Sequence, residues 1–317
     1  MKNILIYNSG GGLGDSIQLF PLILSLKNHF KLARFFYLGA HENHFENKLK
    51  DYNVNLKSLG IDLKYFGFRF WHYFAILEKI SKLNIPKFDL IIDLQSKIRN
   101  TIILKKIPHI DFYSSTLNHF FCTKKNNYVN KNYFENIIKF LDQRIEYKEY
   151  NIKDLPQKFF DEATKLLPGN NYIGLSLTQG NQYRKKSWDL HKFIDLAINL
   201  KKKNKSPVFF IEKKNINLIN KIKSKVPNAL FPELNSSIVS PALVTALSTR
   251  LEKGITIDNG VMHMMGIAKI PLITLFGPTN SEKFSPSYAN VKILDSKVLY
   301  KTKDVNFITV EDVLKYI

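Results

Sequence analysis

Residues 3–21, NILIYNSGGGLGDSIQLFP, join a short apolar run to a glycine-rich loop and a single carboxylate. The run Ile4–Tyr7 is continuous rather than alternating, which is typical of a strand buried on both faces of a parallel sheet. The loop glycines allow positive φ angles and let a ligand approach the backbone closely. Ligands of open parallel sheets bind beyond the carboxyl ends of the strands. We therefore expect Asp15 at the mouth of a binding site.

The glycine loop departs from two nucleotide-binding motifs. Gly10 and Gly12 fit the spacing of G-x-G-x-x-G, but Asp15 stands at the third position, so a dinucleotide site is poorly supported. No G-K-[ST] follows, which excludes a P-loop. Two roles stay open for Asp15: a helix N-cap, which spacing alone favours, and a catalytic carboxylate. Pro21 indicates that the regular helix starts late.

Similar apolar runs alternate with helical patterns along the whole chain. Phe193, Leu196, Ala197 and Leu200, for example, follow the spacing of one apolar helix face. This alternation predicts an α/β fold with doubly wound sheets. The strands that we expect are Asn3–Tyr7, Ala33–Leu38, Leu90–Asp93, Tyr172–Leu177, Val208–Ile211, Ile255–Asp258 and Leu272–Phe276.

The chain has 317 residues, enough for two domains. A new strand–loop–helix pattern begins near residue 172, and the preceding stretch 147–160, YKEYNIKDLPQKFF, is polar and contains Pro156. We place the domains at 1–158 and 159–317. At the end of the chain, Thr309 and Asp312 predict a capped closing helix.

The composition is that of a soluble globular protein, with 44% hydrophobic and 23% charged residues. No apolar stretch approaches the roughly 20 residues of a spanning helix, and the N-terminus does not resemble a signal peptide. The one cysteine, Cys122, excludes an intramolecular disulfide and a cysteine-based metal site. We expect a cytoplasmic protein.

The formal net charge of +20 favours anionic partners: nucleic acid, phosphorylated substrates or an anionic membrane surface. The abundance of Lys, Asn, Ile and Phe fits a compositional origin of this charge equally well. Residues 65–74, YFGFRFWHYF, mix aromatic side chains with Arg69 and His72 and suit a membrane interface. The usual burial of aromatic residues favours a buried helix face there instead.

Two stretches in the second half of the chain suit a diphosphate. In residues 255–279, ITIDNGVMHMMGIAKIPLITLFGPT, a strand ends at Asp258, and Asn259-Gly260 then places backbone N–H groups at a helix N-terminus, a natural phosphate seat. His263, one turn later, is either a phosphate or ribose ligand or a core residue, and the neighbouring methionines suit packing. Residues 176–188, SLTQGNQYRKKSW, are either a second phosphate contact or a solvated basic loop; their candidate groups are Thr178, Gly180, Arg184, Lys185 and Lys186.

These stretches together resemble glycosyltransferase family 9, the ADP-heptose:lipopolysaccharide heptosyltransferases, in four ordered blocks that span the chain. The blocks are GGLGDSIQLFPLILSLK, FDLIIDLQSKIRNTIIL, KSWDLHKFIDLA and IDNGVMHMMGIAKIPLITLFGPTN. The residues in register with the family's motifs are Asp15, Pro21, Lys27, Asp93, Gln95, Arg99, Lys186, Trp188, Asp258, Gly260, His263 and Gly277–Thr279.

The resemblance implies a GT-B fold, with two Rossmann-like domains facing across a cleft. It implies an inverting, metal-independent transfer without a cofactor, in which the N-terminal domain holds the acceptor and the C-terminal domain holds the nucleotide sugar. The catalytic carboxylate falls on Asp15, and the acceptor contacts fall on Gly12, Gly14, Gln95 and Arg99. The donor contacts fall on Thr178, Lys186, Asp258, Asn259, Gly260 and His263, and Glu212 stands near the place of an acidic nucleotide contact.

The residue types fit this chemistry. A carboxylate at a glycine loop can take the proton of an acceptor hydroxyl as that hydroxyl attacks the anomeric carbon. Without a divalent cation, Lys186 and the amides of Asn259 and Gly260 would stabilise the leaving ADP, and Asp258 would orient the turn. Asn259 stands where the family usually has Ser or Thr, Met264-Met265 replace small residues, and FFIEKKN replaces a glycine-rich turn.

The expected partners are a nucleotide-sugar donor, ADP-heptose, and an anionic glycolipid acceptor, with peripheral contact to the inner membrane and no nucleic acid. Alternatives are another nucleotide sugar on the same fold, a non-catalytic binder of nucleotide sugars or envelope glycans, and nucleic-acid binding, which charge alone motivates. The cations of the acceptor half that suit an anionic glycolipid are Lys97, Arg99, Lys105, Lys106, Lys124 and Lys125.

Overall fold

The structure is a computed structural model that describes residues 1–124, 132–180, 185–286, 288 and 290–317; Lys125 and Arg184 lie outside these ranges. The chain divides into two compact units, Met1–Tyr150 and Asn151–Ile317. The predicted boundary between residues 158 and 159 falls inside α6 (Gln157–Leu166). Because α6 packs against α10 (Pro241–Ser248), the whole helix belongs to the second unit.

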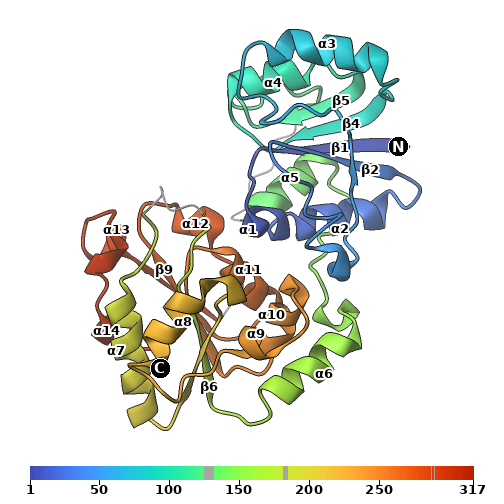
Figure 1. Ribbon diagram of the computed structural model, residues 1–317. Coiled ribbons are helices and arrows are strands. Elements are labelled where there is room, and N and C mark those ends of the chain that lie inside the picture. The colour runs from blue at the N-terminus through green and yellow to red at the C-terminus, as the bar shows by residue number, and fades with distance from the viewer. Residues whose placement is uncertain (125–131, 181–184, 287, 289) are drawn as a thin grey trace. The chain divides into compact units, whose positions relative to one another are not determined.

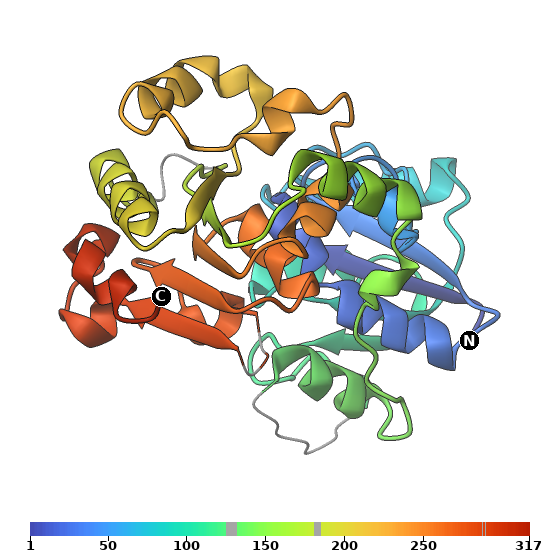
Figure 2. The same cartoon turned by 90° about the horizontal axis from the view of Figure 1, so that it is seen from below.

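The first unit is built on a five-stranded parallel sheet in the order β3-β2-β1-β4-β5. Its central strand, β1 (Asn3–Asn8), is buried along its whole length, as the continuous apolar run predicts. The strand order reverses between β1 and β4 (Phe88–Asp93), and helices cover both faces of the sheet (Figures 1 and 2). The other elements are α1 (Leu13–Ile17), α2 (Phe20–His29), β2 (Arg34–Gly39), β3 (Lys57–Ser58), α3 (His72–Lys82), α4 (Ile98–Leu104), β5 (His109–Ser114) and α5 (Tyr133–Leu141).

The two edge strands of this sheet, β3 and β5, present few free backbone groups, for different reasons. β3 is only two residues long. Along the outer side of β5, the Phe112 N–H donates to Thr123 Oγ1 (2.9 Å), and the Phe112 carbonyl accepts from the Thr123 N–H (3.0 Å). The Ser114 N–H donates to Cys122 Sγ (3.3 Å), and the Cys122 thiol donates to the Ser114 carbonyl (3.2 Å). Residues 122 and 123 therefore occupy the outward hydrogen-bonding groups of Phe112 and Ser114 at this edge.

The second unit repeats the plan of the first. Its parallel sheet has the order β10-β9-β8-β6-β7, and a parallel bridge between Val208 and Leu230 extends it beyond β7. With Leu230 counted as a vestigial third strand, the order begins 3-2-1-4-5 as in the first unit, which is the Rossmann arrangement. The elements are α6, β6 (Tyr172–Ser176), α7 (Leu190–Lys202), β7 (Ser206–Phe209), α8 (Ile216–Lys223), α9 (Pro232–Asn235), α10, β8 (Lys253–Ile257), α11 (Gly260–Ile267), β9 (Leu272–Phe276), α12 (Ser281–Phe284), β10 (Val291–Asp295), α13 (Ser296–Leu299) and α14 (Val310–Leu314).

Local sequence signals in the second unit are confirmed. α7 buries Phe193, Leu196, Ala197 and Leu200, as their spacing predicts. At the start of α14, Thr309 and Asp312 form the expected capping box. Within the described residues, no helix has both the length and the apolar character needed to cross a membrane.

Candidate functional site

Asp15 lies at the carboxyl end of the central strand of the first unit. β1 ends at Asn8, the glycine loop follows, and Asp15 is the third residue of α1. The Gly12 N–H donates to Asp15 Oδ2 at 3.0 Å. The N-cap interpretation of Asp15 is wrong, because Gly12 occupies that position and the carboxylate bonds back to it. This bond holds the carboxylate against the loop that precedes it.

The loop glycines are required for close contact rather than for backbone conformation. A Cβ atom on Gly10 would lie 2.9 Å from Asp15 Cγ, and one on Gly11 would lie 1.9 Å from Cδ2 of His41. The loop does not use the positive φ angles that glycine allows: in the described part of the chain, only Gly60 and Gly67 among the glycines have them. The loop instead runs so close to Asp15 and His41 that side chains would collide.

The carboxyl ends of β1 and β4 are joined by side-chain hydrogen bonds. Asn8 Oδ1 accepts from the Gly10 N–H (3.0 Å) and from Gln95 Nε2 (3.1 Å). The Gln95 N–H donates in turn to Asp93 Oδ1 (2.9 Å). Asn8 therefore places Gln95 beside the glycine loop, at the point where the strand order reverses.

Asp93, at the end of β4, is fully buried. Its Oδ2 atom accepts from Thr101 Oγ1 (2.7 Å) and Ser114 Oγ (2.9 Å). Burial raises the pKa of the Asp93 carboxyl to about 6, although these hydrogen bonds oppose the increase. Asp93 thus holds the backbone of Gln95 from inside the fold. Because the Asp93 carboxylate is fully buried, a ligand cannot contact it.

Arg99 lies in α4 and holds the loop before α3. Its Nε donates to the Gly67 carbonyl (2.7 Å), and its guanidinium lies 5.5 Å from the centroid of the Phe70 ring. Gly67 has a φ of +83°, where a side chain is strained. The four predicted acceptor residues all follow the carboxyl ends of the neighbouring strands β1 and β4: Gly12 and Gly14 at α1, Gln95 after β4, and Arg99 in α4.

In the second unit, Lys186 and Asp258 form an ion pair. Lys186 Nζ lies 2.5 Å from Asp258 Oδ2, and the two side chains are only 15% and 8% exposed. The Lys186 N–H also donates to Gln179 Oε1 (2.9 Å). Asp258 directly follows β8, so the pair fixes the lysine ammonium at the carboxyl end of that strand.

Asn259 connects the two central strands of the second unit. Its Oδ1 caps α11 by accepting from the Met262 N–H (3.0 Å). Its Nδ2 donates to Ser176 Oγ (2.8 Å) and to the Thr178 carbonyl (3.0 Å), at the end of β6. A Ser or Thr hydroxyl has one proton and could not make both of these donations. The structure thus brings Thr178 together with Asn259 and Gly260, and His263 is buried within α11.

Glu212 follows β7 and is exposed, with its carboxylate 2.6 Å from Lys214 Nζ. Sequence reasoning missed Glu233, in α9. Burial raises the pKa of Glu233 to about 7, and the nearby charge of Glu212 adds to the increase. No motif marks Glu233. It reaches the β7 edge of the second sheet only because it follows Leu230, the vestigial third strand. Asn8, His41 and Glu233 all lie outside the four blocks that carry the family resemblance.

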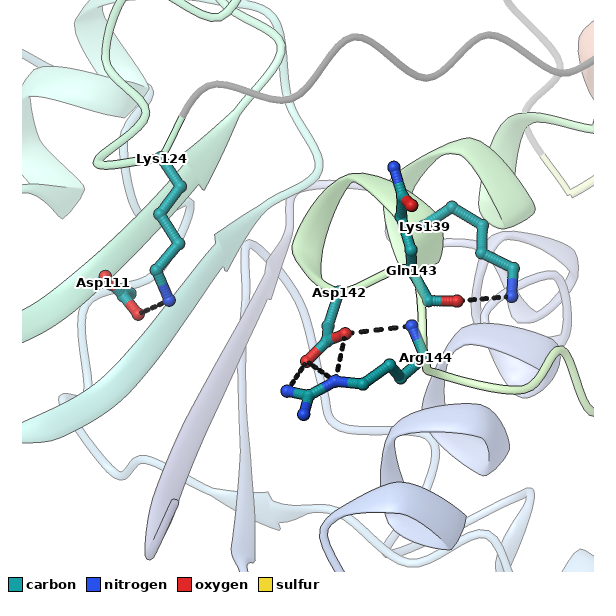
Figure 3. A network of polar contacts seen from close by, with 6 residues as sticks. All are labelled: Asp111, Lys124, Lys139, Asp142, Gln143 and Arg144. Atoms are coloured by element: carbon teal, nitrogen blue, oxygen red, sulfur yellow. Dashed lines mark hydrogen bonds and ion pairs between the residues drawn. The ribbon is translucent and has the colours of Figure 1, made fainter.

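A cavity of about 220 Å³ in the first unit lies elsewhere. It is lined by Met1, before the start of β1, and by residues around the end of α5. Figure 3 shows its ion pairs, Asp111 with Lys124 (2.7 Å) and Asp142 with Arg144 (2.7 Å). Of the residues that the sequence analysis singled out, Lys124, one of the cations of the acceptor half, lines this cavity; the predicted catalytic, donor and acceptor contacts do not. Across the described residues, no group of three or more His, Cys, Asp or Glu side chains is placed to hold a metal ion.

A family model and a curated relative indicate the same family. The model of glycosyltransferase family 9 (heptosyltransferase) matches residues 77–313. Lipooligosaccharide heptosyltransferase 2 of Campylobacter jejuni subsp. jejuni serotype O:2 is 24% identical over 296 residues, which cover 86% of this chain and 81% of the relative.

Two solved structures share the fold. A family 9 glycosyl transferase from Veillonella parvula has a TM-score of 0.68 at 18% identity, over 99% of this chain and 96% of that one. E. coli heptosyltransferase WaaC with ADP has a TM-score of 0.68 at 13% identity, over 99% and 98%. The predicted fold class, GT-B with two Rossmann-like domains, is confirmed.

Proposed function

The chain belongs to glycosyltransferase family 9, the heptosyltransferase family, and is a glycosyltransferase; from that premise we propose that it transfers a heptose from ADP-heptose to a lipopolysaccharide core or another cell-envelope glycan. We propose that the transfer inverts the anomeric centre and needs no metal ion or other cofactor. The name of the Campylobacter relative and the ADP in the E. coli structure support this donor and acceptor. One observation carries the proposal: Asp15 and the Lys186–Asp258 pair each lie at the carboxyl end of a central strand, where α/β sheets bind ligands.

In the first unit, Asp15 is the general base. The acceptor hydroxyl oxygen bonds to the anomeric carbon as the bond from that carbon to the diphosphate breaks, and Asp15 takes the hydroxyl proton. The Gly12 N–H engages only one carboxylate oxygen, Oδ2, which supports this role. Gln95 and Arg99, with the backbone of Gly12 and Gly14, would contact the anionic acceptor.

In the second unit, the diphosphate binds to Lys186, to Thr178 and to the backbone N–H groups at the start of α11. Charge accumulates on the leaving ADP, and a fixed cation stabilises that charge without reorganising. Asp258 is a positioning residue, because its carboxylate holds the ammonium of Lys186. His263 would contact a phosphate or ribose, and Glu212 would contact the nucleoside.

The test of Asp15 is the Asp15→Asn variant, assayed with ADP-heptose and a purified core acceptor. We expect turnover to be lost while calorimetry still detects ADP binding and the melting temperature stays unchanged. Asp62→Asn is the matched control, since Asp62 is an exposed carboxylate of the same unit with a φ of 51° that asparagine tolerates. Turnover by Asp15→Asn at the wild-type rate would exclude Asp15 as the base.

The donor is tested by thermal shift with ADP, UDP, GDP and CDP, then with ADP-heptose, each with and without EDTA. A ligand that binds only the folded state raises the melting temperature by mass action. We expect a selective increase with ADP and ADP-heptose that EDTA does not change. Preference for another nucleotide would reassign the donor on the same fold. The observation that favours this second candidate function, transfer from another nucleotide sugar, is that the Asn259 side-chain amide already hydrogen-bonds to protein groups.

A further inference from the structure

Exposed apolar side chains lie in the turn before α3, on α3 and on α4. Phe70, Phe74 and Leu77 are 76%, 72% and 45% exposed and recur at the spacing of one helix face. Ile98 and Ile102, 45% and 41% exposed, form a matching row on α4. α3 and α4 pack against each other on the same face of the sheet (Figure 1).

The prediction of a buried aromatic face holds for only part of the segment: Phe66 and His72 are buried, whereas Phe70 and Phe74 are exposed. α3 buries only His72 and Ile76. Trp71, at the start of the helix, is 58% exposed.

Cations surround this surface. Lys97 lies 5.6 Å from the centroid of the Phe68 ring, and Lys105 and Lys106 lie over Phe121 (5.8 Å) and Tyr73 (4.6 Å). None of these lysines has an acidic partner among the residues that the structure describes. Residues 64–106 hold nine Lys or Arg and three Asp or Glu, and one of the three, Asp93, is fully buried. We name Phe70, Trp71, Phe74, Leu77, Ile98 and Ile102, with Arg69, Lys97, Arg99, Lys105 and Lys106, the α3–α4 patch.

We propose that the α3–α4 patch docks this protein on the surface of an anionic lipid bilayer. Aromatic and aliphatic side chains enter the boundary between headgroups and acyl chains, and Lys and Arg remain at the level of the headgroup phosphates. Each basic residue near an anionic surface adds attraction. Charge complementarity selects this occupant, since a second copy of the same basic patch would be repelled.

The patch is continuous with the proposed acceptor site through Arg99. This side chain contacts Phe70 in the patch and holds the Gly67 carbonyl, and it belongs to the same helix that follows Gln95. Docking on a bilayer would present a lipid-linked acceptor beside Arg99. That consequence rests on the proposed function, whereas the docking itself does not.

Vesicle binding by the full chain tests the proposal without any turnover. The protein is sedimented with vesicles of phosphatidylglycerol and phosphatidylcholine, and with vesicles of phosphatidylcholine alone. We expect binding to the anionic vesicles only, weakened by salt. We expect Phe74→Gln/Leu77→Gln to lower the partition coefficient at least about tenfold, and Lys97→Ala/Lys105→Ala to lower it about fivefold for each charge removed.

The matched control is Lys31→Ala/Leu32→Ser, which removes one cation and one apolar side chain from an exposed turn of the same unit. We expect it to bind as wild type apart from the loss of one charge. Circular dichroism verifies that each variant is folded. No binding of the wild type to anionic vesicles overturns the proposal, and so does unchanged binding by Phe74→Gln/Leu77→Gln. A folded, vesicle-binding protein without transferase activity would refute the proposed function and leave this inference standing.

Discussion

The ion pair between Lys186 and Asp258 makes a prediction that separates folding from donor binding. Both side chains are largely buried, and their charged atoms are 2.5 Å apart. Lys186→Ala removes the cation and leaves the Asp258 carboxylate buried without it. Breaking a buried pair in this way typically costs about 3–5 kcal/mol of folding free energy. We therefore expect the second unit to unfold at a much lower urea concentration.

The double variant Lys186→Met/Asp258→Asn removes both charges at once. Replacing a buried pair by uncharged groups of similar volume is often neutral for stability or favourable. We expect the double variant to regain most of the lost stability, to within about 1 kcal/mol of wild type. We expect neither variant to bind ADP, because the fixed cation is absent from both.

Urea denaturation followed by tryptophan fluorescence is the assay. Trp188 is 2% exposed and lies two residues beyond Lys186, so its emission reports unfolding of the second unit. Calorimetry with ADP measures binding separately. A loss below about 1 kcal/mol in Lys186→Ala would contradict the buried-pair argument. A double variant as unstable as the single one would show that the ammonium stabilises the unit through other groups.

Three further predictions concern the loops. Gly11→Ala should lower turnover up to about 100-fold, because it displaces the loop that leads to the base, Asp15. Adding His41→Ala should restore much of the lost turnover, since the clash is with the His41 ring. Turnover measured for the single and double variants decides whether this explanation holds. The pKa of Asp93 is about 6 in the fold and ~3.9 unfolded, so the folded state gains stability as pH falls through 6. Urea denaturation at pH 7.5 and 5.0 should therefore show a gain of about 1.4 kcal/mol in wild type relative to Asp93→Asn, and equal pH dependence of the two would refute it. Asn259→Ala should lower stability by at least about 1 kcal/mol, because the cap of α11 is lost together with the donations to Ser176 and Thr178. Asn259→Ser should recover the part due to the cap in the same denaturation experiment.

The buried strands could be predicted from the sequence because their apolar runs are continuous. β1, β4, β6, β8 and β9 all lie where such runs occur. β5 and β10 were missed, since HIDFYS and VKILD mix polar and apolar residues, as strands at the edge of a sheet do. β3 is too short for any pattern, and the bridge at Leu230 is set by packing rather than by local sequence.

The site was predicted less completely than the fold. Motif spacing made Asp15, Lys186 and the turn at Asp258 candidates, and in the structure all three follow strands. It could not show that Gly11 packs on His41, since that contact joins loops after different strands and leaves no spacing signature. The loop glycines are needed although none of them has a positive φ, because a neighbour in space can also require a glycine.

The covered edge of β5 has a consequence for the aggregation of this protein at high concentration. Unpaired strand edges are templates on which other chains add, and aggregation begins there. Cys122 and Thr123 occupy those groups on β5 with a thiol, a hydroxyl and one backbone unit. The only cysteine of the chain thus hydrogen-bonds to the backbone of an edge strand and blocks pairing with another chain there. Alkylation of the Cys122 sulfur would break its hydrogen bonds to Ser114 and expose that edge, which would promote self-association. Every proposed substrate contact would stay in place.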